Sequence, residues 1–157
     1  MVKIQHSQYA QAEEALRRAI ELFQKDNKRV RSAGGRSAAV EMGRLFREKG
    51  DLKKASFWFQ RALRADPRYG DAYIFLGDIA FKSGRLNHAE KLYRKAIDHS
   101  ACSVDEAYFN LGGLFIARRR YREAIQCYRR AIKIDPRYAI AKKRLNDALL
   151  ALELKNS

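Results

Sequence analysis

Small, aromatic and apolar residues recur along this chain in a pattern that repeats every 34 or 35 residues. Gly43, Gly77 and Gly112 mark three copies, and an alanine, an aromatic residue and a second alanine follow each glycine at the same distances. Within a copy these three residues are separated by four and then three positions, which places them on one face of a helix. The pattern therefore predicts three helical hairpins, each of which stacks on its neighbours to bury its apolar face.

The residue types at the repeated positions indicate how the two helices of a hairpin pack. Glycine and alanine allow the backbones to approach closely, and the aromatic side chain fills the space beside them. Gly50 and Gly84 fall between the two helices of their hairpins, where a left-handed residue ends the first helix, and Arg119 takes this position in the third copy. Asp-Pro-Arg-Tyr occurs at 66–69 and 135–138, after two of the second helices. Proline stops a helix, so we expect these two helices to end there.

Both ends extend the pattern. Residues 8–24 repeat the alanine–large–alanine step of a second helix, and 25–35 is a polar, basic stretch that we interpret as a loop. At the other end, 139–154 carries an apolar stripe and is expected to form a last helix.

These residues resemble the tetratricopeptide repeat (TPR) family, whose signature is Leu-Gly, an aromatic, Ala, aromatic, Ala and Pro over one repeat. The resemblance covers about 36–137. It implies an all-α fold, an α-solenoid (right-handed superhelix) of three helical hairpins within a single domain, 1–157. The expected parts are a half-repeat helix at 8–24, the basic loop at 25–35, repeats at 36–69, 70–104 and 105–138, and a capping helix at 139–154 with a polar outer face.

The resemblance also implies a function, that of a non-catalytic adaptor or scaffold for protein–protein interaction. In this family the first helix of each pair lines a concave groove for a partner segment. The residues at the corresponding positions are Val40, Arg44, Arg47, Asp71, Ile74, Asp78, Phe81, Lys82, Phe109, Asn110 and Ile116, and further candidates are Ser37, Glu106, Gly113, Lys143 and Asp147. An alternative for Ile74, Phe109 and Ile116 is a place in the core between repeats.

One subclass of the family is unlike this chain. Repeats that grip the carboxylates of chaperone tails use lysines and asparagines, but Val40, Arg44 and Phe75 stand at three of those positions. Asn110 alone matches the asparagine with which some of these superhelices hold a peptide backbone.

The net charge of +15 is concentrated in two blocks. Residues 25–64 contain 12 Lys/Arg and 4 Asp/Glu, residues 118–144 contain 11 and 2, and the intervening 65–117 contain 6 and 7. Such blocks favour an acidic protein partner or an anionic surface and leave nucleic acid as an alternative, although interleaved aromatic residues for base stacking are lacking. The candidate anion contacts are Lys28, Arg29, Arg31, Arg118, Arg119, Arg120 and Arg122.

A third hypothesis is self-assembly. The helix at 8–24 has no first-helix partner, so its apolar face is available for exchange between chains, with Gly34 and Gly35 as a hinge. A homo-oligomer is therefore a further alternative.

Nothing in the sequence indicates catalysis, a cofactor or a metal site. Phosphate-binding loops and Ser/His/Asp arrangements are missing, and Cys102 and Cys127 are too few for a disulfide framework. For Asp71 and Asp105, N-capping is the expected role. Without a membrane span or a signal peptide in the sequence, we expect a cytoplasmic protein.

Overall fold

The computed structural model describes residues 33–99 and 103–156, together with positions 10, 11, 13–15, 17, 18 and 21 near the N-terminus. For 33–37 and 156 the description covers the backbone alone. The described positions between 10 and 21 are helical. Most of the basic loop, with its candidate anion contacts Lys28, Arg29 and Arg31, lies outside the described residues. The same holds for Leu16, Ile20 and Phe23, apolar residues of the helix at 8–24 that the self-assembly hypothesis uses.

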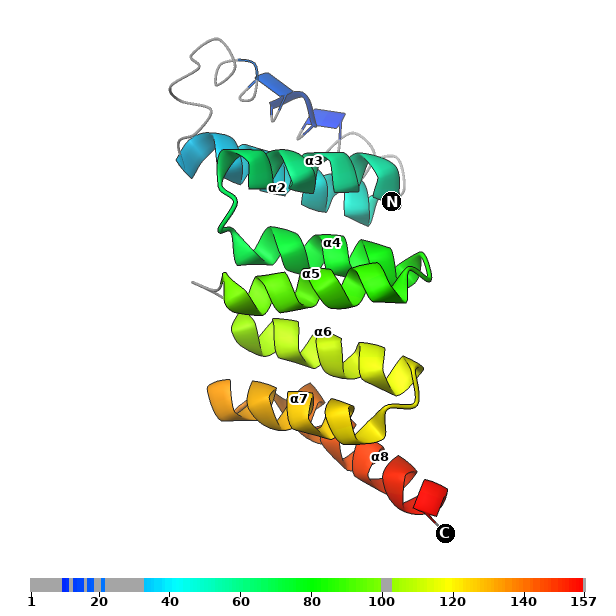
Figure 1. Cartoon of the computed structure of the whole chain (residues 1–157). Coiled ribbons are helices and arrows are strands. Elements are labelled where there is room, and N and C mark those ends of the chain that lie inside the picture. Colours follow the sequence, from blue (N-terminus) through cyan, green and yellow to red (C-terminus); the bar gives the residue numbers. More distant parts are fainter. Residues whose placement is uncertain are drawn as a thin grey trace. The chain divides into compact units, whose positions relative to one another are not determined.

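The predicted all-α fold class is confirmed, since every regular element of the described chain is a helix. The chain divides into two compact units, Met1–Ala72 and Tyr73–Ser157, which are considered separately below. Figure 1 labels the helices from α2 on. They are α2 (Ala33–Glu48), α3 (Leu52–Ala65), α4 (Gly70–Lys82), α5 (Leu86–Asp98), α6 (Val104–Ala117), α7 (Tyr121–Ile134) and α8 (Ala139–Asn156).

In the first unit α2 and α3 form a hairpin around a glycine–aromatic contact. A Cβ atom added at Gly43 would lie only 2.5 Å from the ring of Phe59, which is itself fully buried. Asp51 then begins α3 by accepting a hydrogen bond from the Lys54 amide at 3.0 Å. The start of α2 at Ala33 places Gly34 and Gly35 inside a helix rather than in the expected loop and hinge.

The second unit repeats this packing twice. The ring of Tyr93 on α5 covers Gly77 of α4, and the ring of Tyr128 on α7 covers Gly112 of α6. An added Cβ atom would lie 2.5 Å from the first ring and 2.6 Å from the second. The interpretation of the repeated glycines and aromatic residues as close-packing positions is therefore confirmed.

The turns between paired helices share one backbone conformation. Gly50, Gly84 and Arg119 have φ angles of 78°, 72° and 57°. The residue after each donates its backbone N–H to a carbonyl five residues earlier, as from Arg120 to Phe115 at 2.9 Å, which is the Schellman ending of a helix. Arg119 thus adopts a backbone conformation that is usually found for glycine.

Two expectations about helix ends are wrong. Asp71 and Asp105 are not N-caps, because both lie inside the first turn of their helices, and Ser103 is the N-cap of α6. Carboxylates in a first turn are still favoured, since they face the positive end of the helix dipole.

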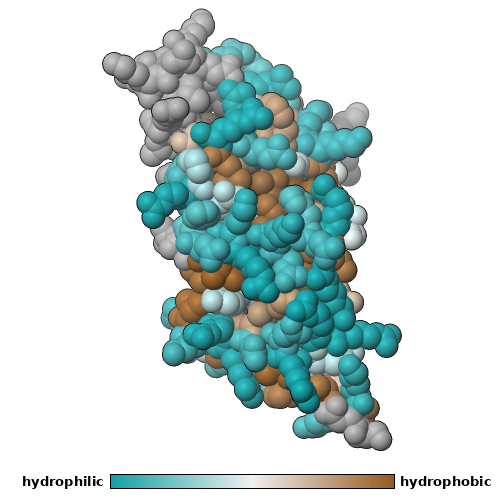
Figure 2. All heavy atoms as spheres, in the orientation of Figure 1, coloured by the Kyte–Doolittle hydropathy of each residue, from teal (hydrophilic) through white to brown (hydrophobic). Residues whose placement is uncertain are grey.

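The last helix, α8, packs on α7, and its Ala141 and Ala148 are fully buried. Its outer surface is less polar than expected for a cap, because Ile140, Leu150 and Leu154 are 59%, 57% and 71% exposed. Figure 2 shows hydrophilic side chains over most of the visible face, with hydrophobic ones exposed in separate patches. None of the described helices is both long and apolar enough to cross a membrane.

Candidate binding groove

Two adjoining hollows run along α4, α6 and α8 of the second unit. The smaller, of about 140 Å³, lies between α4 and α6, and the larger, of about 390 Å³, lies between α6 and α8. Phe109 and Gly113 of α6 line both hollows, so the two form one surface that we call the groove. Eight predicted residues line it: Asp78, Phe81, Lys82, Phe109, Asn110, Gly113, Ile116 and Asp147.

Helical spacing explains why these side chains share a face. On α6 the steps from Phe109 to Gly113 and on to Ile116 are four and three residues, so all three project on the same side. Gly112, one residue away, is turned toward Tyr128 instead. The hairpin contact and the groove thus occupy neighbouring faces of one helix.

Asp78 ties three helices together at the α4–α6 hollow. Its Oδ1 accepts hydrogen bonds from the Tyr93 hydroxyl of α5 at 2.8 Å and from Nδ2 of Asn110 on α6 at 3.1 Å. Burial, followed by the charge of Asp78, raises the pKa of Tyr93 well above its ordinary value of 10. The hydrogen bond between Asp78 and Asn110 therefore joins α4 and α6 at the base of the groove, and both side chains make this part of the groove polar.

Sequence reasoning missed this link, although a signal for it exists. The residue after the repeated glycine is Arg44, Asp78 and Gly113 in the three repeats, and the covering aromatic is Phe59, Tyr93 and Tyr128. Only the second repeat combines a carboxylate with a hydroxyl, and these are the two groups that bond.

An aromatic wall continues the groove toward α8. The ring of Phe109 lies 5.8 Å from that of Tyr128 and 5.1 Å from that of Tyr138. Burial raises the pKa of Tyr128 to about 12. At Gly113 the wall is open, because an added Cβ atom would meet only the Tyr128 hydroxyl, at 4.0 Å.

Other predicted groove residues lie elsewhere. Ile74 is 1% exposed and packs with Ala96 and Ala107, so it belongs to the core, as the alternative for it allowed. Val40, on α2 of the first unit, is 3% exposed, and its side chain does not reach a ligand in this conformation.

The remaining candidates in the first unit are polar. Arg44 and Arg47 lie partly exposed on α2, and Asp71 lies on the first turn of α4. Their contribution to a binding surface stays a prediction.

The predicted arginine cluster at the α6–α7 turn is joined to glutamates of the chain. Arg118 donates to Glu90 Oε2 at 2.6 Å, and Arg94 donates to Glu90 Oε1 at 2.9 Å. Arg120 pairs with Glu123. Arg118 and Arg120 thus connect parts of the second unit, whereas Arg119 and Arg122 are exposed.

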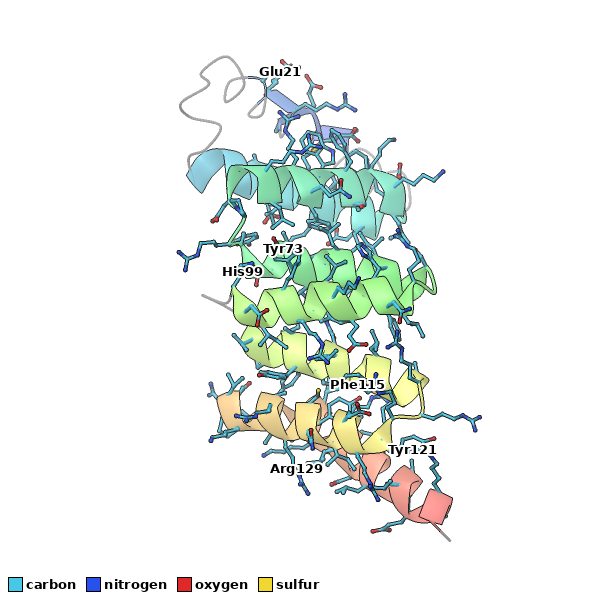
Figure 3. All side chains as sticks on the ribbon, in the orientation of Figure 1. Glu21, Tyr73, His99, Phe115, Tyr121 and Arg129 are labelled. Carbon is cyan, nitrogen blue, oxygen red and sulfur yellow. The ribbon has the colours of Figure 1, made fainter. Side chains whose placement is uncertain are left out.

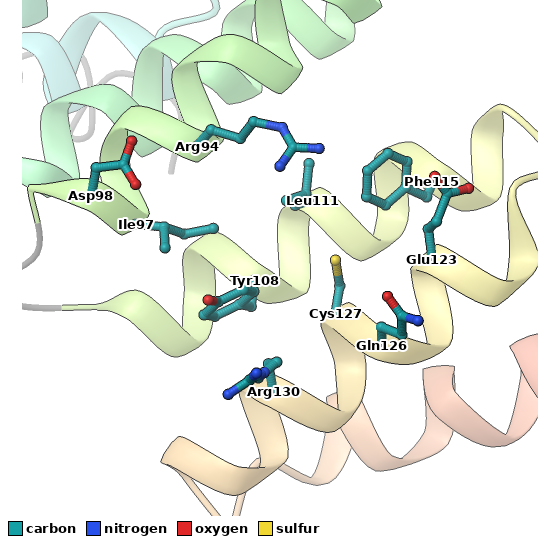
Figure 4. Close-up of a pocket in the computed structure, with 10 residues that line it drawn as sticks. All are labelled: Arg94, Ile97, Asp98, Tyr108, Leu111, Phe115, Glu123, Gln126, Cys127 and Arg130. Atoms are coloured by element: carbon teal, nitrogen blue, oxygen red, sulfur yellow. The ribbon is translucent and has the colours of Figure 1, made fainter.

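A third hollow, of about 550 Å³, lies on a different side of α6, between α5 and α7. Figure 4 shows this back hollow with Arg94, Tyr108, Gln126, Cys127 and Arg130 around it. Burial raises the pKa of the Cys127 thiol to about 11, so the thiol is protonated at neutral pH and is a poor nucleophile. No group of three potential metal ligands occurs in the part of the chain that the structure describes.

Comparison with known proteins agrees with this architecture. Family models described as tetratricopeptide repeat match residues 40–104 and 105–138. The chain therefore belongs to the tetratricopeptide repeat family.

A curated relative is the type IV pilus assembly protein PilF of Pseudomonas aeruginosa, which is 28% identical over 91 residues. The match includes 58% of this chain but only 36% of PilF, so the chain spans about a third of the length of that relative.

Solved structures share the fold at low identity. The crystal structure of MamA superposes with a TM-score of 0.74 at 19% identity, over 97% of this chain and 85% of MamA. The first TPR of Spaghetti (RPAP3), bound to the HSP90 peptide SRMEEVD, gives a TM-score of 0.69 at 21% identity, over 75% of this chain and 93% of that one. The Arabidopsis OM64 TPR domain gives a TM-score of 0.66 at 19% identity, over 73% of this chain and 93% of that domain.

Proposed function

We propose that this chain is a non-catalytic protein-interaction module that holds a segment of a partner protein in the groove of its second unit. The observation that carries the proposal is the pair of adjoining hollows that share Phe109 and Gly113. Apolar walls with a few fixed polar groups are typical of surfaces that hold a ligand by a small number of anchor side chains.

The amide of Asn110 supports an extended peptide as the ligand. One N–H of Nδ2 donates to Asp78, which fixes the orientation of the side chain. The second N–H and the amide oxygen complement the C=O and N–H of a peptide backbone. A structural neighbour, the first TPR of Spaghetti (RPAP3), is itself bound to a peptide.

The test begins with selection of short random peptides on the immobilised wild-type chain. The selected peptides are then titrated against two variants that each add a leucine to a hollow. Gly113→Leu obstructs the groove from a position with open space around it. Gln126→Leu is the matched control, because it adds the same side chain to the back hollow.

We expect Gly113→Leu to weaken binding of the selected peptides by at least about tenfold, since central contacts dominate the affinity of such interfaces. Gln126→Leu should leave their affinity unchanged, and far-ultraviolet circular dichroism should show equal helicity for both variants. Selected peptides that bind Gly113→Leu as tightly as the wild type would disprove binding in the groove.

A further inference from the structure

The larger hollow of the groove, between α6 and α8, is lined mainly by aromatic rings and small residues. The rings of Phe109, Tyr121 and Tyr128 border it, and Gly113 and three alanines leave its space of about 390 Å³ unfilled. Aromatic rings pack favourably edge to face against one another, beyond what the burial of their area contributes. The hollow therefore suits a large aromatic side chain.

The charged groups of this hollow balance one another. Of the residues that line it, Arg144 and Asp147 are charged, and Arg144 Nη1 lies 3.8 Å from Asp147 Oδ2. One cation beside one carboxylate gives the hollow no net charge with which to select a ligand. Recognition at this point therefore depends on the size and shape of an apolar side chain.

Two exposed leucines continue the apolar surface along α8. Leu150 and Leu154 both project into solvent. Leu150 follows Asp147 by three residues, and Leu154 follows Ala151 by three residues, and both Asp147 and Ala151 line the hollow. Residues three apart on a helix lie on the same side of it. The leucines thus extend the side of α8 that borders the hollow toward the C-terminus of the helix.

A contact at the last turn of α8 supports this continuity. Nζ of Lys155 lies 6.0 Å from the ring centre of Tyr121, which lines the hollow beside this end of the helix (Figure 3). Ile140, at the other end of α8, is also exposed. The charged side chains of Lys143 and Arg144 separate Ile140 from the apolar lining, so it does not continue the same surface.

The geometry of an extended chain relates the hollow to the leucines. A side chain that packs between Leu150 and Leu154 lies about five residues along α8 from Asp147, which is about 7.5 Å. In an extended chain, residues two positions apart point to the same side and are about 6.7 Å apart. A segment that leaves the hollow along α8 therefore brings to the leucines the side chain two positions from the one in the hollow.

We propose that the groove holds an extended segment with an aromatic residue and, two positions away in sequence, a large aliphatic residue. The aromatic side chain enters the α6–α8 hollow, and the aliphatic one packs on Leu150 and Leu154. This inference rests on the proposed function, since it names the chemistry of the segment that the groove holds. It also gives a function to two leucines that a capping helix with a polar outer face would not expose.

The test uses three sets of short synthetic peptides without charged side chains. The first set contains tryptophan and leucine separated by one residue, in either order. In the second set glutamine replaces the leucine, and in the third set leucine replaces the tryptophan. Fluorescence anisotropy gives the affinity of each set and of the peptides that were selected on the wild-type chain.

Two double variants each remove two exposed apolar side chains. Leu150→Gln with Leu154→Gln changes the proposed contact on α8. Phe57→Gln with Ile134→Gln is the matched control, because both residues are exposed and neither lines the groove. Gly113→Leu and the wild type complete the series, and circular dichroism checks that all variants have the same helicity.

We expect the first set to bind the wild type about tenfold more tightly than the second, because its leucine is buried on α8. It should bind about fivefold more tightly than the third set, which lacks the contacts between rings. Leu150→Gln with Leu154→Gln should remove the tenfold difference, and the control variant should keep it. Gly113→Leu should weaken the binding of every set.

Equal affinities of the first and second sets for the wild type would overturn the contact on α8, and equal affinities of the first and third sets would overturn the aromatic preference. Sedimentation must give the mass of a monomer for the wild type. A dimer that dissociates in the leucine variant would also overturn the inference, because a second copy would then cover the leucines. In each of these cases the proposed function stands if Gly113→Leu weakens binding of the selected peptides, and it fails with the inference if their binding is unchanged.

Discussion

Two adjacent glycines of α6 have opposite roles. One allows α6 to pack closely on α7, and the other leaves the groove open on the neighbouring face of α6. Gly112 is required by close packing, because a Cβ atom there would enter the ring of Tyr128. Gly113 faces open space, and its lack of a side chain leaves a hollow.

The difference between the two positions extends through the repeats. The glycine under the aromatic ring is present in all three copies, whereas the next residue is Arg44, Asp78 or Gly113. Packing between paired helices is thus the same in every repeat, and the chemistry of the exposed face is set repeat by repeat.

The largest expected effect separates the two glycines directly. Gly112→Ala should lower the free energy of unfolding by about 2 kcal/mol, because the added methyl group overpacks against the ring of Tyr128. Gly113→Ala should raise it by up to about 1 kcal/mol, since alanine favours a helix more than glycine does. Urea denaturation followed by circular dichroism measures both. Equal changes for the two variants would refute the distinction drawn between these positions.

The ion pairs of Glu90 allow the outer side of the second unit to be weakened without touching the groove. Glu90 is bonded to Arg94 and Arg118, and its side chain is only 17% exposed. Glu90→Gln should therefore lower the free energy of unfolding by about 1.5 kcal/mol, whereas Glu123→Gln, at a more exposed pair, should cost less. Peptide affinity at the groove should be unchanged in folded Glu90→Gln. A large loss of that affinity would show that the two faces are coupled.

The turn residue Arg119 offers a smaller, stabilising change. Arg119→Gly should raise the free energy of unfolding by about 1 kcal/mol, because glycine adopts the positive φ angle without strain. Gly84→Ala is the reverse experiment at the corresponding turn and should lower it by about 1 kcal/mol. Thermal unfolding of both variants shows whether each change raises or lowers the stability. Destabilisation by Arg119→Gly would contradict this account of the turn.

The smallest expected effect concerns pH and tests the surroundings of Tyr138, where burial and, after it, nearby carboxylates raise the pKa of the hydroxyl. The pKa of Tyr138 is raised from 10 to about 12 in the folded chain, so its contribution to stability is complete below pH 10 and is lost as pH rises through 12. The free energy of unfolding should therefore fall slightly more over this range in the wild type than in Tyr138→Phe. The difference is small because Tyr138 is partly exposed to solvent. An identical pH dependence would contradict the raised pKa of Tyr138 in the folded chain.

Much of the fold follows from the sequence because its determinants are local and repeated. The glycine–aromatic contacts and the left-handed position of Arg119 were predictable from alignment of the three copies. Burial was harder to predict, since Ile74 and Ile116 both fall on the predicted groove line, yet only Ile116 lines the groove. Helical periodicity gives the direction of a side chain and does not say which neighbouring helix covers it.

The electrostatics of the groove could not be predicted from charge counts. The basic block at 118–144 places one cation, Arg144, in the lining of the groove, whereas Arg118 is joined to Glu90, and Arg129 points away from the neighbouring helices (Figure 3). The carboxylates of Asp78, Asp105 and Asp135 are far apart in sequence, yet all three add to the effect of burial in raising the pKa of Tyr138. Which charges of a segment reach the groove therefore depends on the folded structure and not on the sum over the segment.

The most direct test of the central claim is a nitrogen-15 NMR titration of the chain with a peptide selected on the wild type. We predict that the largest shift changes occur at the amides of Asn110, Gly113, Ile116 and Asp147, which line the groove. Changes centred instead on Arg94, Tyr108 and Arg130 would place the ligand in the back hollow and contradict the account.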